Sequence, residues 1–138
     1  MEGQSAVSGP LYVVDTCILV DHLRGYRPAK DWLTGVIRNY PQAVLAYSVI
    51  TLAELASGLL TPQSKEATER LLGIMRAIPL SEEMAWLAGS FVGTWRASHG
   101  LELPDALIAA TAKCLKAPLV TRDRSHFPVE DLPVIAPY

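Results

Sequence analysis

Residues 11–24 read LYVVDTCILVDHLR, a stretch whose character changes at its fifth residue. Four mostly apolar residues run into Asp15, and an apolar segment resumes at Cys17. A short β-branched run that stops at a carboxylate and restarts as a helix predicts a buried strand that leads into a strand-to-helix turn. In open parallel sheets, chemistry gathers beyond the carboxyl ends of the strands. Asp15 is therefore the first candidate site residue.

The same alternation of strand and helix continues along the chain. Further strands are predicted over residues 43–47, 77–80, 118–121 and 132–135. Helices are predicted over residues 16–23, 28–40, 49–60, 63–76, 82–99 and 106–116. This alternation favours a parallel sheet with helices on both faces. We therefore expect one three-layer α/β/α domain over residues 11–138, with a central parallel sheet of four to five strands.

Composition limits the classes of function. The chain has 138 residues, of which 50% are hydrophobic and 19% charged, which suits one domain with a sizeable core. The formal net charge of −2 argues against a protein that holds nucleic acid by general basicity. It still allows an enzyme that meets nucleic acid through metal ions in an acidic site, because the cations then supply the positive charge.

The chain ends and the cysteines bear on its location. No apolar run approaches the roughly 20 residues of a membrane span. Residues 1–10 lack the basic start and apolar core of a secretion signal, and we expect a flexible tail there, native or added. Cys17 and Cys114 are predicted to be buried free thiols, since neither belongs to a CxxC pair that would indicate a zinc or redox site. A reducing cytoplasm fits this pattern.

Four of the fourteen acidic residues stand apart from the solvated helix faces. Asp15 ends the first strand, Glu54 lies in a helix made mainly of apolar and small residues, Asp105 opens the most apolar helix, and Asp123 follows the fourth strand. Each has an ordinary explanation as a helix cap, a turn residue or an exposed helix residue. Together, however, all four map to one edge of a parallel sheet, which favours a shared site.

Such a cluster would repel itself without a cation. Hard oxygen ligands select Mg²⁺ or Mn²⁺, and Mg²⁺ keeps waters that can act as nucleophiles. A divalent ion held by carboxylates suits phosphodiester hydrolysis, because it activates a water and neutralises charge on the reacting phosphate. The chain contains neither GxGxxG nor GxxxxGK[ST], so no glycine-rich phosphate loop competes with this interpretation.

Four segments carry a resemblance to a known family. They are YVVDTCILVDHLRG at 12–25, SVITLAELASGL at 48–59, LPDALIAATA at 103–112 and LVTRDRSHF at 119–127. In this order and spacing the chain resembles the PIN-domain ribonucleases, and among them the VapC-like toxins of type II toxin–antitoxin modules. The motifs are short, but together they span nearly all of residues 11–135.

The resemblance implies roles for particular residues. It assigns the acidic metal-binding and catalytic positions to Asp15, Glu54, Asp105 and Asp123, and the supporting hydroxyls to Thr16 and Thr121. Many relatives carry Asn in place of Asp123, so the resemblance assigns direct metal contacts to Asp15 and Asp105 before Asp123.

Other polar residues near the motifs have weaker signals. Arg122 and Arg124 are candidate phosphate contacts, although exposed basic loop residues are more often ordinary surface. We expect His126 to pack or cap rather than catalyse. For Asp21 we expect a surface position or a contact between helices.

The resemblance also implies an activity and partners. The implied activity is Mg²⁺- or Mn²⁺-dependent endoribonuclease activity on RNA (tRNA, rRNA or mRNA). The implied partners are a second copy of the chain, which makes a homodimer, and an antitoxin that lays a helix along the toxin and blocks the acidic cleft. The helices around 32–37, 50–60 and 86–95 hold more apolar residues than one core face needs, and they could receive such partners. Core packing of the tryptophans is the ordinary alternative.

Two other functions stay open. A haloacid-dehalogenase-like phosphatase would need a second Asp two residues after Asp15, where this chain has Cys17. A non-catalytic PIN-fold interaction module would be favoured if one of the four acids were missing, and none is.

Overall fold

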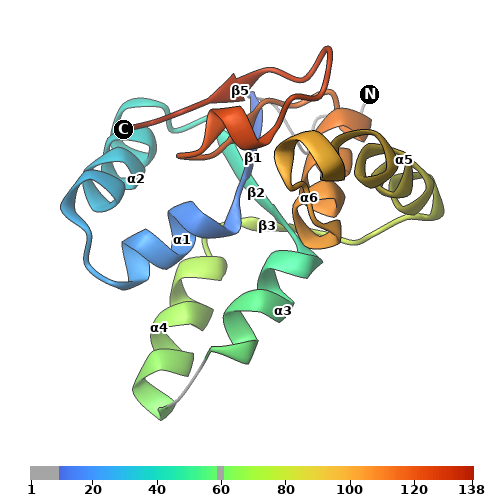
Figure 1. Cartoon of the computed structure of the whole chain (residues 1–138). Helices are drawn as coiled ribbons and strands as arrows, with labels where there is room; N and C mark the ends of the chain where they lie inside the picture. The colour runs from blue at the N-terminus through green and yellow to red at the C-terminus, as the bar shows by residue number, and fades with distance from the viewer. Residues whose placement is uncertain (1–9, 59–60) are drawn as a thin grey trace.

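The central feature of the protein is a five-stranded parallel sheet in the order β3-β2-β1-β4-β5. The computed structural model describes residues 10–58 and 61–138. The strands are β1 (Leu11–Val14), β2 (Val44–Ser48), β3 (Arg76–Ile78), β4 (Leu119–Val120) and β5 (Val134–Ile135). Since β1 lies between β2 and β4, its carboxyl end is at the centre of one edge of the sheet (Figure 1).

Helices cover both faces of the sheet and confirm the predicted three-layer architecture (Figure 1). They are α1 (Thr16–Leu23), α2 (Arg27–Asn39), α3 (Val49–Ser57), α4 (Pro62–Leu72), α5 (Glu82–His99) and α6 (Leu103–Cys114), with a 3-10 turn, η2, at Arg124–His126. In Figure 1, α1, α2 and α4 lie on one side and α5 and α6 on the other. Within the described ranges, no helix is both long and apolar enough to cross a membrane.

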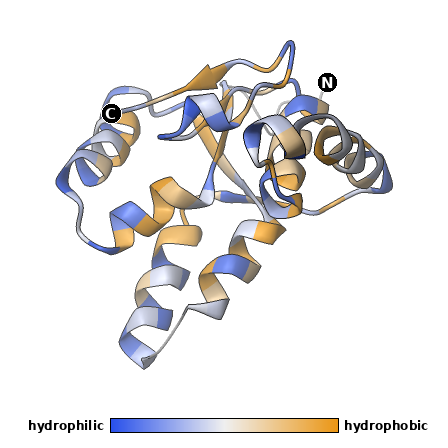
Figure 2. Ribbon diagram, viewed as in Figure 1, coloured by the Kyte–Doolittle hydropathy of each residue, from blue (hydrophilic) through white to orange (hydrophobic). Residues whose placement is uncertain are grey.

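Alternation along the strands divides the apolar residues between two cores. Val13 packs in one core with Phe91 of α5 and Ile108 of α6, whereas the adjacent Val14 packs in the other core with Leu19 and Leu33. Successive side chains of a strand point to opposite faces, so a central strand must be apolar on both. In Figure 2, hydrophobic residues gather in the middle of the molecule, where the strands and helices meet.

Several predicted element boundaries were wrong by a few residues. The helix expected over 63–76 ends at Leu72, because Gly73 caps it, and Arg76 belongs to β3 instead. The helix predicted to open at Leu103–Asp105 does begin at Leu103, since Pro104 fits the first turn of a helix, but it ends at Cys114 rather than at residue 116. The strand expected over 118–121 is only Leu119–Val120.

Two other predictions meet the limits of the described residues. The helix predicted over 49–60 ends at Ser57, and residues 59–60 lie outside the described part of the chain. Of the predicted tail over 1–10, only Pro10 is described, and its carbonyl accepts a hydrogen bond from the amide of Val44.

Asp21 is buried, which corrects the expectation of a surface or helix–helix position. Its residue is only 6% exposed. One Oδ accepts a hydrogen bond from Nη1 of Arg122 at 2.6 Å, and the other accepts from Nη1 of Arg122 at 2.8 Å and from the hydroxyl of Tyr138 at 2.7 Å. The expectation failed because both partners lie more than 100 residues away, at separations of 101 and 117. The side chain thus ties α1 to the loop after β4 and to the chain beyond β5.

Substitution Asp21→Ala should destabilise the fold. Loss of a buried acceptor leaves the Arg122 guanidinium and the Tyr138 hydroxyl without their partner, which costs about 1–3 kcal/mol. For a domain of this size the melting temperature should fall by roughly 4 °C per kcal/mol. Thermal unfolding followed by circular dichroism measures the change.

Asp31→Ala is the matched control, because Asp31 makes an exposed ion pair with Arg27 on α2. Exposed pairs contribute little, so this variant should melt like the wild type. Equal melting temperatures for the Asp21 and Asp31 variants would contradict a structural role for Asp21.

Candidate active site

Asp15 occupies the turn between β1 and α1 and is fixed from three directions. Its Oδ1 accepts a hydrogen bond from the amide of Thr16 at 2.8 Å, which makes it the N-cap of α1. Its Oδ2 accepts from the hydroxyl of Thr121 at 2.8 Å, and its own amide donates to the carbonyl of Val120 at 2.8 Å. The residue is 6% exposed, so its carboxylate is held rigidly at the carboxyl edge of the sheet.

Thr121 links Asp15 to the loop after β4. The residue is fully buried, and its hydroxyl oxygen also accepts a hydrogen bond from the amide of Asp123 at 3.2 Å. The Asp123 carboxylate itself accepts a hydrogen bond from the hydroxyl of Ser125 at 3.1 Å. Asp123 is therefore tied to the Asp15 cluster through its backbone, while its side chain is held locally in the η2 turn.

Thr16 brings Glu54 to the same edge. The hydroxyl of Thr16 donates to Oε1 of Glu54 at 2.7 Å and lies 2.9 Å from the hydroxyl oxygen of Thr51. Glu54 is in the second turn of α3 and Thr16 opens α1, so this contact joins the N-terminal halves of two helices. The side-chain hydroxyl of Thr16 thus supports Glu54, whereas its backbone supports Asp15.

Asp105 reaches the site from the first turn of α6. Its Oδ2 lies 2.9 Å from Nε2 of His126 in η2. The ring of His126 also packs edge-on against Phe127, with the ring centroids 5.4 Å apart. The prediction that His126 packs is thus confirmed, but its contact with Asp105 was missed, and it makes His126 a candidate orienting group for that carboxylate.

The carboxylates interact through their charges. Burial raises the pKa of Asp15, and the nearby charge of Asp105 raises it further, against the lowering effect of the hydrogen bond from Thr121. A buried carboxylate with a second negative charge near it is stabilised by a cation. The negative charge at this edge of the sheet therefore favours the binding of a cation.

Cys17 also borders Asp15, which sequence reasoning missed. Its thiol lies 3.4 Å from Oδ2 of Asp15 and 3.5 Å from the hydroxyl oxygen of Thr121. Burial, and then the Asp15 charge, raise the pKa of Cys17 to about 11, so the thiol stays protonated at neutral pH. The sequence signal that could have indicated this contact is the position of Cys17, two residues after the carboxylate in the turn. Both cysteines are free as predicted, although each is only partly buried.

The donor set fits a divalent cation with retained waters. Within residues 10–58 and 61–138, no three side chains among Asp, Glu, His and Cys come close enough to form a complete metal centre. Mg²⁺ does not need one, because it usually binds through one or two carboxylates and keeps several waters. Asp15 and Asp105 carry the hard oxygen atoms that such a site needs, and their ligation of a metal stays a prediction. Ligation by all four acids stays a prediction.

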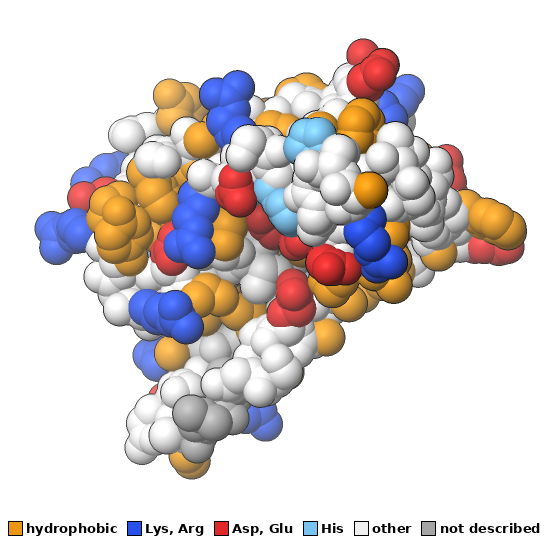
Figure 3. Space-filling model, in the orientation of Figure 1, with side chains coloured by type: hydrophobic (Ala, Val, Ile, Leu, Met, Phe, Trp, Pro, Cys, Tyr) orange, Lys and Arg blue, Asp and Glu red, His pale blue; other side chains and the backbone are white. Residues whose placement is uncertain are grey.

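Acidic and basic side chains occupy different parts of the face that carries these residues. Figure 3 shows acidic and histidine side chains gathered at the centre of this face, with Lys and Arg side chains on either side of them. Of the two predicted phosphate contacts, Arg124 is exposed at the start of η2, whereas Arg122 is partly engaged by Asp21. A polyanion could approach the acidic centre along the basic flanks.

Comparison with known proteins places this geometry in a family. The chain matches the PIN domain over residues 12–130. It is 39% identical over 120 residues to ribonuclease VapC10 of Mycobacterium tuberculosis, covering 86% of this chain and 87% of that protein. It is 34% identical over 118 residues to ribonuclease VapC19 of the same species, covering 85% and 92%.

A solved structure agrees with the sequence matches. VapBC-1 from nontypeable Haemophilus influenzae superposes with a TM-score of 0.74 at 28% identity, covering 92% of this chain and 98% of that one. The family match contains every residue of the Asp15 site, from Asp15 to η2. The chain therefore belongs to the PIN-domain family and, within it, to the VapC ribonucleases.

Proposed function

We propose that this protein is a metal-dependent endoribonuclease that hydrolyses phosphodiester bonds in RNA and serves as the toxin of a toxin–antitoxin module. One observation carries the proposal: the buried carboxylate of Asp15, fixed by Thr16 and Thr121 at the carboxyl edge of a parallel sheet, lies near enough to Asp105 for the charge of Asp105 to raise its pKa. The kinship with ribonucleases VapC10 and VapC19 supports RNA as the substrate.

Each residue has a role in this proposal. Mg²⁺ or Mn²⁺, when bound, supplies activation of a water and neutralisation of charge on the phosphate. Asp15 and Asp105 would hold it, and the hydroxyl of Thr121 fixes the Asp15 carboxylate in one orientation. Thr16 occupies Oε1 of Glu54, so Oε2 can accept a hydrogen bond from the attacking water.

The proposed partners are an antitoxin and a second copy of the chain. Several solved neighbours are toxin–antitoxin complexes, which supports the antitoxin. Large apolar side chains are exposed on three helices: Ile37 on α2 is 51% exposed, Leu52 on α3 42% and Trp86 on α5 76%. These lie where partner surfaces were predicted, and Trp86 does not belong to the core. We place the activity in the cytoplasm, and tRNA, rRNA and mRNA are all candidate substrates.

The alternatives are disfavoured by the same site. A phosphatase of the haloacid-dehalogenase type would need an Asp where Cys17 stays a neutral thiol. A non-catalytic module would have no need to bury Asp15 beside another carboxylate, because that arrangement costs stability unless a cation is bound.

Substitution Asp15→Asn should abolish RNA cleavage while leaving the fold intact. The amide oxygen of Asn can still cap α1, but the side chain loses the charge that holds a cation. Cleavage of a labelled total-RNA substrate should fall by roughly 10²–10³-fold or more, the scale of losing one electrostatic group in an active site. Asp31→Asn on α2 is the charge-matched control, and its cleavage should equal that of the wild type. Wild-type cleavage or toxicity of Asp15→Asn would refute the mechanism.

Removal of divalent ions should stop the reaction. EDTA should eliminate cleavage by the pure protein, and either Mg²⁺ or Mn²⁺ in excess should restore it, because both are hard cations that suit carboxylate ligands. Initial rates on a labelled RNA before and after chelation measure this. Cleavage that persists in EDTA would instead indicate a metal-free nuclease.

Substitution Glu54→Gln should weaken metal binding rather than folding. Gln keeps an oxygen that accepts from Thr16, so the contact between α1 and α3 survives. Titration calorimetry with Mn²⁺ should show an affinity reduced by roughly 10–100-fold, the range for residues that support a metal site.

The melting temperature of metal-free Glu54→Gln should match that of the wild type and of Glu69→Gln, a control in the exposed part of α4. A large loss of stability without metal would make Glu54 a structural residue.

A further inference from the structure

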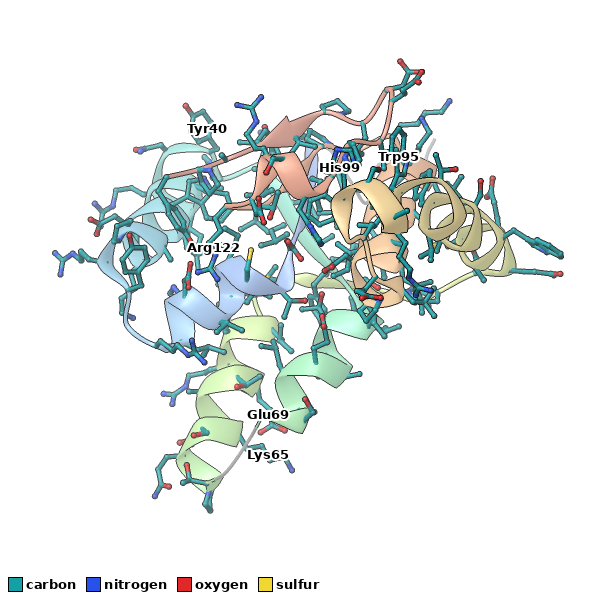
Figure 4. The ribbon with its side chains drawn as sticks, viewed as in Figure 1. Tyr40, Lys65, Glu69, Trp95, His99 and Arg122 are labelled. Carbon is teal, nitrogen blue, oxygen red and sulfur yellow. The ribbon has the colours of Figure 1, made fainter. Side chains whose placement is uncertain are left out.

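A cavity lies between the C-terminal end of α1 and the loop after β4. It has a volume of about 590 Å³ and is lined by Asp21, Arg24, Gly25, Tyr26, Arg122 and Tyr138. Arg122 stands between Thr121 and Asp123 in the chain, so one lining residue of the cavity is the direct neighbour of two residues of the candidate site. Figure 4 shows Arg122 above α1, close to the centre of the molecule.

Asp21 holds Arg122 in place at this wall. Both hydrogen bonds from Arg122 to the Asp21 carboxylate use Nη1, which leaves Nε and Nη2 as donors for a ligand within the described part of the chain. The side chain of Arg122 is 52% exposed, whereas that of Asp21 is 9% exposed. A guanidinium that is fixed on one edge and open on the other suits a phosphate, because its donors already have the fork geometry that phosphate oxygens need. Asp21 is thus a positioning residue for Arg122.

Two tyrosines supply aromatic surface at the same cavity. The rings of Tyr26 and Tyr138 meet edge to face, with centroids 5.6 Å apart and planes inclined by 64°. Both residues are exposed, Tyr26 at 51% and Tyr138 at 36%. Because the Tyr138 hydroxyl donates to Asp21, the carboxylate that orients Arg122 also orients this ring. Exposed aromatic rings next to a guanidinium are the combination on which unpaired nucleobases stack.

Arg24 connects this cavity to the acidic site. It also lines a neighbouring cavity of about 390 Å³ whose wall includes Glu54. The two cavities therefore lie on either side of one exposed basic side chain. Since the whole chain carries a net charge of −2, RNA must be held by local basic positions of this kind rather than by overall charge.

We propose that the cavity of Arg24, Tyr26, Arg122 and Tyr138 binds one unpaired nucleotide of the RNA that flanks the scissile bond. The phosphate lies against Arg122 and Arg24, and the base lies against the tyrosine rings. The inference rests on the proposed ribonuclease function, and it adds a recognition subsite that favours single-stranded over fully paired RNA.

A binding experiment tests the subsite separately from cleavage. The probe is a fluorescein-labelled random-sequence RNA of eight nucleotides, followed by fluorescence anisotropy in EDTA at low salt. The double variant Arg24→Ala/Tyr26→Ala should bind about tenfold more weakly than the wild type, since loss of base stacking and of a phosphate contact is expected to have that scale. Tyr26→Phe, which keeps the ring, should bind like the wild type.

The control is Arg38→Ala/Tyr40→Ala, which removes the same charge and an exposed tyrosine from the end of α2. It should bind like the wild type, so a general electrostatic effect is excluded. Equal binding by the two double variants, or no RNA binding by the wild type, would overturn the subsite. Tyr26→Phe that binds as weakly as the Arg24→Ala/Tyr26→Ala variant would overturn base stacking on this ring.

Cleavage of the same RNA by the wild type with Mg²⁺ reports on the proposed function alone. Wild-type protein that binds but never cleaves, with binding lost in the Arg24→Ala/Tyr26→Ala variant, would refute the nuclease while supporting the subsite. Wild-type protein that cleaves, with undiminished binding by the Arg24→Ala/Tyr26→Ala variant, would support the nuclease and refute the subsite.

Discussion

The hydrogen bond from the hydroxyl of Thr121 to the carboxylate of Asp15 is the contact on which the functional architecture depends. A buried carboxylate is costly unless it is compensated, so the two residues must meet. They meet because β1 and β4 pair in parallel with Val14 opposite Val120, which puts the next residue of each strand at the same edge. A shift of one residue would turn Thr121 to the other face and leave Asp15 without this donor.

The same parallel arrangement collects the other acids. Each strand-to-helix connection of a parallel sheet directs a helix N-terminus toward the carboxyl edge of the strands. Asp15 caps α1 and Asp105 lies in the first turn of α6, so the positive ends of both helix dipoles face the carboxylates. These dipoles offset part of the repulsion between the carboxylates.

The layers and the candidate acids could be predicted from sequence because their signals are local. Apolar runs with turn residues mark the strands, and a carboxylate in an apolar setting, such as Glu54, is conspicuous wherever it folds. The contacts between side chains could not be predicted in the same way. Asp21 meets Arg122 only through the loop after β4, and His126 reaches Asp105 only because a 3-10 turn redirects the chain after Asp123. Such contacts depend on strand register and on turn geometry, and a short sequence motif determines neither.

The Asp21 contact changes how the basic residues of the face are understood. Arg122 looked from sequence like a free loop cation, yet the structure shows it anchored on one side and available on the other. The acidic centre and its basic, aromatic border are thus two parts of one surface. The first part is suited to hold a cation, and the second to hold the polyanion that this cation would act upon.

Anomalous diffraction from crystals grown with Mn²⁺ would test the central claim most directly, because it locates the ion without reference to activity. We predict a peak between the carboxylates of Asp15 and Asp105, with Glu54 beside it. A peak elsewhere on the molecule with that position empty, under conditions in which the protein cleaves RNA, would contradict it.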